Sequence, residues 1–136
     1  MATKIFLNLA VDDLNKSVEF FTKLGYTFNL QFTSEQATCM IISDTIYVML
    51  LTKPFFQSFT TKKQLVDTSK EFEVSICISA ESKEEVDAIV KKAEAAGATI
   101  PDAATDHGWM YQHSFDDLDG HHWEYAWMDP AGPPQG

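Results

Sequence analysis

Residues 11–25 read VDDLNKSVEFFTKLG, and this stretch decides the first half of the fold. Its apolar residues recur at spacings of four, three and three, which places them on one face of a helix: Leu14, Val18, Phe21 and Leu24. Asp12 or Asp13 can accept hydrogen bonds from the free N–H groups of the first turn. Gly25 can adopt the left-handed conformation that ends a helix. The stretch therefore predicts an amphipathic helix over residues 12–24.

The same pattern returns in the second half of the chain, where residues 82–97 read SKEEVDAIVKKAEAAG. Ser82 and Glu85 have the spacing of a capping box, and Gly97 takes the place that Gly25 has in the first half. The apolar stripe of this second helix consists of Val86, Ile89, Val90, Ala93 and Ala96. A second amphipathic helix is therefore predicted over residues 82–96.

Each predicted helix follows one apolar strand and precedes three more. The strands expected in the first half are residues 5–11, 26–32, 36–42 and 45–51, and those in the second half are residues 74–79, 99–100, 109–115 and 122–128. Tight turns at Ser43-Asp44 and Asp119-Gly120 join the last two strands of each half. The chain thus has the order strand, helix, three strands, and has it twice. This is an α+β fold of paired βαβββ units, and duplication explains it.

The length of 136 residues predicts a single domain over residues 1–136. Within it we expect a first unit over residues 4–52, a second unit over residues 71–128 and a frayed tail over residues 129–136. The connecting segment, residues 53–70, contains Pro54 and three phenylalanines, so it is too apolar for a free linker. We expect a short helix or loop that packs on the sheet or on a second copy of the chain. Whether the segment closes over a ligand as a lid is left open.

Twenty acidic and ten basic residues give a formal net charge of −10. Phosphate groups repel such a surface, so neither nucleic acid nor an anionic membrane is an expected partner. The longest apolar run, residues 46–51, is too short to span a bilayer, and no signal-peptide pattern is visible. Cys39 and Cys77 lie in separate apolar runs, which favours buried free thiols. A soluble, cytoplasmic protein is therefore expected.

Three motifs in the right order resemble the vicinal oxygen chelate superfamily, which includes glyoxalase I, extradiol dioxygenases, fosfomycin-resistance enzymes and bleomycin-binding proteins. The first is the strand-to-helix entry over residues 11–26, and the second is the helix over residues 84–98. The third, residues 117–124, reads DLDGHHWE and is similar to the family's last hairpin, usually D-P-D-G-x-x-x-E. The resemblance covers residues 4–128. It implies a cup-shaped mixed sheet with helices outside and the ligand inside, and often a homodimer.

The resemblance also implies positions for one divalent metal, held by His, Gln or Glu on the first and fourth strands of both units. Those positions fall on Phe6, Met49 (or Val48 with a slip of one residue), Glu73 and Glu124. Two of the four are carboxylates and two are apolar, so the set departs from the family's catalytic pattern. Asn8, two residues beyond Phe6, faces the same side but is a weak donor.

A shifted metal site is an alternative, built on Glu124 with His122 and with Glu73 or His113. His122 and Glu124 are two positions apart on one predicted strand, so both side chains face the same side of the sheet. Such a site could hold Ni²⁺, Zn²⁺, Mn²⁺ or Fe²⁺. The contrasting interpretation is that these histidines are polar strand and loop residues with ordinary partners. Glu124 is the candidate catalytic acid or base, because desolvation there would raise its pKa.

Aromatic residues crowd the second half of the chain. Trp123, Tyr125 and Trp127 alternate with Glu124, so we expect them to pack under the second helix as core. The residues expected to line the ligand pocket are Phe6, Asn8, Met49, Trp109, Tyr111 and His113.

Three functions therefore stand side by side. The first is a glyoxalase-like protein that binds a small organic molecule in the cup. The second is a metal-dependent lyase or dioxygenase with the shifted site, and the third is an antibiotic-sequestering protein without chemistry. No Gly-x-Ser-x-Gly motif and no phosphate-binding glycine motif is present to support another class.

Overall fold

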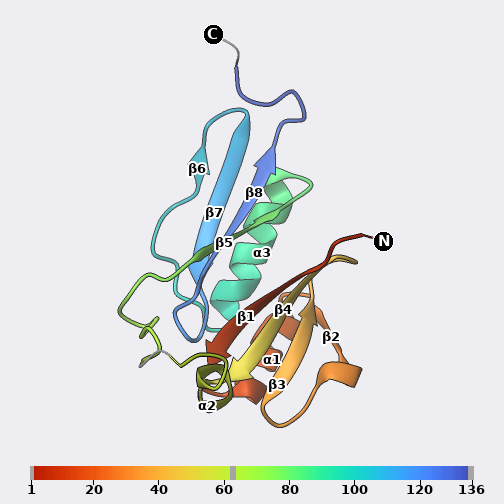
Figure 1. Ribbon diagram of the computed structural model, residues 1–136. Helices are drawn as coiled ribbons and strands as arrows, with labels where there is room; N and C mark the ends of the chain where they lie inside the picture. Colours follow the sequence, from red (N-terminus) through yellow and green to blue (C-terminus); the bar gives the residue numbers. More distant parts are fainter. Residues whose placement is uncertain (1, 62–63, 135–136) are drawn as a thin grey trace. The chain divides into compact units, whose positions relative to one another are not determined.

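A computed structural model describes residues 2–61 and 64–134. The chain divides into two compact units, residues 1–65 and 66–136, each with one four-stranded sheet (Figure 1). The boundary falls inside the predicted connecting segment. Each unit has the predicted order of strand, helix and three strands, which confirms the α+β fold class.

The first unit consists of β1 (Ile5–Val11), α1 (Leu14–Lys23), β2 (Thr27–Asn29), a 3-10 turn η1 (Leu30–Phe32), β3 (Ala37–Ile41), β4 (Ile46–Thr52) and α2 (Lys53–Gln57). Its sheet has the order β1-β4-β3-β2, with β1 parallel to β4 and the other pairs antiparallel. The helix α1 begins at Asp13, whose carboxylate accepts the N–H of Lys16 at 3.1 Å. It ends before Gly25, which has a φ of +107°.

The second unit consists of β5 (Ser75–Ser79), α3 (Lys83–Ala95), β6 (Thr105–Asp106), β7 (Met110–Asp116) and β8 (His122–Met128). Its sheet has the order β5-β8-β7-β6, with β5 parallel to β8. Ser82 caps α3 by accepting the N–H of Glu85 at 3.1 Å. The Glu85 carboxylate accepts the N–H of Glu81 at 3.0 Å. In a standard capping box it would accept the N–H of the capping residue itself, which here is Ser82.

In the second unit α3 lies along one face of the sheet (Figure 1). The buried side chains of the helix are Val86, Val90 and Ala93. Phe115 and Trp123 are fully buried, and Tyr125 is buried as well. The predicted core positions Trp123 and Tyr125 are therefore confirmed, whereas Trp127 is half-buried.

Two predicted strands differ from the structure. The strand expected over residues 26–32 ends at Asn29, because the Asn29 side chain accepts the N–H of Gln31 at 3.0 Å and starts the turn η1. Residues 99–100 contribute a single bridge between Thr99 and Asp116, and the edge strand is β6.

The start of the connecting segment forms α2, which contacts β1 and β4. A short helix packed on the sheet was one of the forms expected for this segment. Lys53 at its first position pairs with Asp12, with 2.6 Å between Nζ and Oδ1. Both cysteines are free thiols, but Cys77 is exposed, and the prediction that it is buried was wrong because it lies on the sheet face away from α3. None of the helices within residues 2–61 and 64–134 combines the length and apolar character that a membrane crossing requires.

Candidate functional site

The polar residues of β7 and β8 share the sheet face turned away from α3. Asp116 pairs with His122 and Ser114 pairs with Glu124, and paired residues on neighbouring strands project to the same face. Phe115 and Trp123, which alternate with them, are buried on the α3 side. The second unit therefore presents acidic groups and a histidine together on one face.

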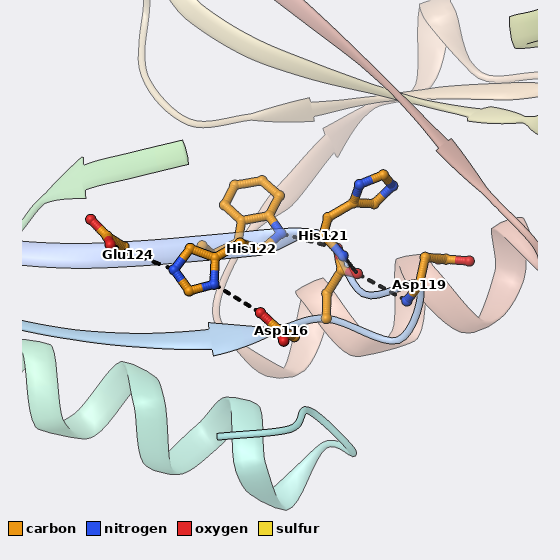
Figure 2. Close-up of polar contacts among 7 residues, drawn as sticks. Asp116, Asp119, His121, His122 and Glu124 are labelled. Carbon is orange, nitrogen blue, oxygen red and sulfur yellow. Dashed lines mark hydrogen bonds and ion pairs between the residues drawn. The ribbon is translucent and has the colours of Figure 1, made fainter. Parts of the chain in front are cut away.

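His122 lies between two carboxylates on this face (Figure 2). Its Nδ1 is 2.8 Å from Asp116 Oδ1, and its Nε2 is 3.5 Å from Glu124 Oε1. The three side chains are 18 %, 32 % and 33 % exposed, respectively, so a solute can reach all of them. A ring proton on Nδ1 is donated to Asp116, which leaves Nε2 directed at Glu124. The arrangement can accept hydrogen bonds from a ligand and exchange a proton with it.

Two adjoining cavities border these residues, each of about 430 Å³. They share His122 and Asp102. The first cavity is walled by residues 68–74 and includes Asp116, and the second is walled by residues 102–105 and includes Glu124. These volumes fall within the range of small-molecule pockets.

The walls of the two cavities are acidic. One of the lining residues, Lys70, carries an amine, whereas five carry carboxylates: Glu71, Glu73, Asp102, Asp116 and Glu124. Ionised carboxylates can accept hydrogen bonds but cannot donate them. The site therefore favours a ligand that offers donors.

The buried carboxylate of Asp117 holds the turn from which β8 begins. Asp117 Oδ1 accepts the N–H of Asp119 at 2.9 Å and that of His121 at 3.0 Å, and Oδ2 accepts the indole N–H of Trp123 at 3.0 Å. Burial raises the pKa of Asp117 above its ordinary value. Because these bonds hold His121 and Trp123, the two sequence neighbours of His122, they also position the His122 imidazole.

Residues 67–74, here called the strap, pack on the same turn. The Thr68 hydroxyl donates to the carbonyl oxygen of Asp119 at 2.7 Å. Gly120 has a φ of +85°, and a Cβ there would collide with the carbonyl oxygen of Thr68. Further along the strap, the ring of Phe72 lies 5.8 Å from the His122 ring, measured between centroids.

The structure brings His122 and Glu124 together but not the full predicted metal set. Glu73 lies before β5 begins, and it borders the first cavity, whereas Glu124 borders the second. The β5 residue paired with Glu124 is Cys77. Partial desolvation raises the pKa of the Cys77 thiol, and the negative charge of Glu124 raises it further. Both effects disfavour the thiolate, which is the form that binds metals.

A divalent metal does not fit these residues as the family pattern would require. Among residues 2–61 and 64–134, no three His, Cys, Asp or Glu side chains are grouped so that they could hold a metal ion. Phe6 has no donor atom, and its ring stacks on Tyr47 with 5.0 Å between centroids. Asn8 and Met49 pair on β1 and β4 of the first unit.

The other residues predicted to line the pocket lie elsewhere in the second unit. Tyr111 pairs with Trp127 on the α3 side, and its hydroxyl donates to Asp87 of α3 at 2.6 Å. Tyr111 was expected to line the pocket, and it is not among the residues that border either of the two cavities. Trp109 precedes β7, at the opposite end of the strand from Asp116, and its carbonyl accepts the N–H of Asp129. His113 borders the second cavity, with its Nε2 3.0 Å from the carbonyl oxygen of Asp102.

Sequence reasoning missed Asp116, Asp102 and Phe72. Asp116 could have been found by extending the predicted strand over residues 109–115 by one position, because the hairpin register then sets Asp116 opposite His122. Asp102 and Phe72 lie outside any helix or strand, so periodicity carries no signal for either residue.

Comparison with known proteins identifies the class. The sequence profile of the Glyoxalase/Bleomycin resistance protein/Dioxygenase superfamily matches residues 5–125, so the chain belongs to this superfamily. The recognition made from the three motifs is confirmed. A comparison with curated protein sequences returned no match.

Solved structures agree with this assignment. A hypothetical protein from S. aureus is 30 % identical, with a TM-score of 0.76 over 93 % of this chain and 94 % of that one. A glyoxalase-related enzyme from Fulvimarina pelagi is 17 % identical, with a TM-score of 0.80 over 100 % and 94 %. A genomically encoded fosfomycin resistance protein from Listeria monocytogenes is 18 % identical, with a TM-score of 0.69 over 96 % and 97 %. The last two likenesses concern the fold alone.

Proposed function

We propose that this chain binds a small organic molecule on the β7–β8 face turned away from α3. One observation carries the proposal: His122, held between Asp116 and Glu124, borders two adjoining cavities of about 430 Å³ each. A half-buried histidine with a carboxylate on each ring nitrogen is a polar anchor that can fix the orientation of a bound molecule.

Glu124 and His122 are the residues that we propose for any proton transfer. Asp116 holds Nδ1 of the ring, so the exchangeable position is Nε2, which faces Glu124. A ligand hydroxyl or amine that contacts both Nε2 and Glu124 from the cavity could lose a proton to either group. The structural relatives include a glyoxalase-related enzyme and fosfomycin resistance proteins, so the test must distinguish binding from conversion of the bound molecule.

The test is a screen of small hydroxylated and amine-bearing compounds by ligand-observed NMR with the full chain. Compounds that bind should lose affinity in Glu124→Gln and in His122→Asn. The matched control is Glu94→Gln, which removes the same charge from an exposed position on α3. Binding that survives both site variants would contradict the proposal. Recovery of the compound unchanged or converted then separates sequestration from catalysis.

A second candidate is a metal-dependent lyase or dioxygenase whose shifted site keeps Glu124 and His122 but not Glu73, which borders the other cavity. The observation that favours it is the proximity of two ligand-type atoms, His122 Nε2 and Glu124 Oε1, at 3.5 Å. Elemental analysis and thermal shifts with Ni²⁺, Zn²⁺, Mn²⁺ and Fe²⁺ test it. A shift of several degrees that is lost in Glu124→Gln would support this candidate, and no shift with any of the four ions would reject it.

A homodimer and a cytoplasmic location remain predictions from the resemblance and the composition. Light scattering on the purified full chain tests the first, and fractionation of the source cells tests the second.

A further inference from the structure

We propose that the strap is a ring-selecting wall of this site, with Phe72 as the specificity-determining residue, and that the ligand is a planar ring compound carrying hydrogen-bond donors. This inference rests on the proposed function and adds a ligand class to it. It names a residue outside the predicted set, since Phe72 belongs to no helix or strand and to no motif.

The strap has a defined conformation at its start. The carbonyl oxygen of Asp67 accepts the N–H groups of Lys70 and Glu71, and the Asp67 carboxylate accepts the N–H of Ser69 at 3.0 Å. The Glu71 carboxylate in turn accepts the N–H of Asp67 at 3.1 Å. These bonds make residues 67–71 a closed turn, so the position of Phe72 follows from where that turn is attached.

The turn is attached to the β7–β8 connection. The hydrogen bond from Thr68 to the carbonyl oxygen of Asp119 fixes one point, and the missing side chain of Gly120 lets the two backbones come into contact. The same connection leads directly into His122. One anchor therefore sets the distance between Phe72 and the imidazole.

Phe72 stands beside His122 with its ring largely uncovered. The residue is 72 % exposed, although its ring centroid is 5.8 Å from that of His122 at an interplanar angle of 44°. Both residues line the first cavity, together with Asp116. An uncovered aromatic face at a cavity wall is suited to stack on a second flat ring.

The polar side of the same cavity defines the other half of the ligand. Asp116 accepts hydrogen bonds and donates none when ionised, and the same is true of the other carboxylates in the wall of this cavity, Glu71, Glu73 and Asp102. A ring that stacks on Phe72 therefore meets acceptors at its edge. A planar amidine or amine fits this arrangement, whereas a planar carboxylate would meet like charge.

The experiment measures binding of three probes to the full chain by NMR titration. Benzamidine is a planar ring with donors, guanidine has the donors without the ring, and benzoate has the ring without donors. We expect benzamidine to bind and benzoate not to bind. Phe72→Leu should weaken benzamidine about three- to tenfold, guanidine should be unchanged, and Phe72→Tyr should restore benzamidine affinity. An equal loss for guanidine and benzamidine, or no loss for either, would overturn the inference.

The attachment of the strap provides a second and independent test. Thr68→Val keeps the shape of the side chain and removes the hydroxyl that bonds to Asp119. It should weaken benzamidine but not guanidine, as Phe72→Leu does. Unchanged benzamidine affinity in Thr68→Val would contradict the role of the anchor.

Failure of this inference can be told apart from failure of the proposed function. If screened compounds lose affinity in Glu124→Gln but no ring compound responds to Phe72→Leu, the proposed function stands and the ring-selecting wall is wrong. If no bound compound responds to Glu124→Gln or His122→Asn, both are wrong.

Discussion

The Thr68 hydroxyl donates a hydrogen bond of 2.7 Å to the carbonyl oxygen of Asp119, which joins the strap to the turn between β7 and β8. The two residues are 51 positions apart in sequence. The turn carries Asp117, which fixes the start of β8, and the strap carries Phe72, which lies against His122. The contact between Thr68 and Asp119 therefore helps to position the aromatic and the titratable parts of the candidate site relative to each other.

Gly120→Ala should destabilise the protein much more than Gly108→Ala. The two glycines have nearly the same φ, +85° and +84°, so both variants pay the cost of a left-handed alanine, about 1 kcal/mol. Nothing lies within 4 Å of a Cβ at position 108, but a Cβ at position 120 would collide with the Thr68 backbone. We expect Gly120→Ala to cost about 3 kcal/mol or more in total. Urea unfolding measures both values, and equal losses would show that the strap does not pack on this turn.

Asp117→Asn should lower the free energy of unfolding by about 1–3 kcal/mol. Three N–H groups converge on the carboxylate, from the Asp119 and His121 backbones and the Trp123 indole. An amide has one acceptor oxygen, so its NH₂ group must face at least one of these donors. Because burial raises the pKa of Asp117, the substitution also removes a desolvated charge, but we expect the lost acceptor to outweigh this gain. Thermal unfolding checks the result, with Asp129→Asn, whose carboxylate accepts one exposed N–H, as the control.

The sequence was sufficient for the elements but not for the full site. The helices were predicted from local signals, namely the two apolar stripes and the glycines at positions 25 and 97. Their predicted first and last residues lie within two positions of those in the structure. The alternation of side chains along one strand was enough to place His122 and Glu124 on the same face of the sheet. Phe72 could not be placed, because its contact with His122 depends on an anchor between residues distant in sequence. Tyr111, which was expected to line the pocket, lies opposite Trp127 and bonds to Asp87, a placement that depends on strand pairing and has no local sequence signal.

Tyr111 should ionise at a pH well above that of an ordinary tyrosine. The hydrogen bond from its hydroxyl to Asp87, at 2.6 Å, together with burial and the negative charges nearby, raises its pKa to about 12. A raised pKa means that this bond stabilises the fold fully below the unfolded value of about 10 and is lost as the pH rises toward about 12. Ultraviolet titration of wild type and Tyr111→Phe identifies the late step. Asp87→Asn should move that step to lower pH, and an unmoved step would show that Asp87 is not its cause.

Glu124→Gln should make Cys77 more reactive toward iodoacetamide. Partial desolvation raises the pKa of Cys77, and the carboxylate of Glu124, its partner in the β5–β8 register, raises it further. Removing that negative charge lowers the pKa, so more thiolate is present at neutral pH and alkylation should accelerate several-fold. The partial desolvation remains, so the thiol of the variant should still react more slowly than a free cysteine.

The rate at Cys77 can be followed by mass spectrometry of the peptides from the alkylated protein. Cys39 is an internal reference, because it is buried in the first unit and should be unaffected. Glu94→Gln controls for the change in net charge, since Glu94 is exposed on α3. A faster reaction in Glu124→Gln alone would show that the carboxylate acts on the thiol directly. Equal rates in all three proteins would mean that Glu124 does not face Cys77, and the arrangement of the candidate site would then have to be revised.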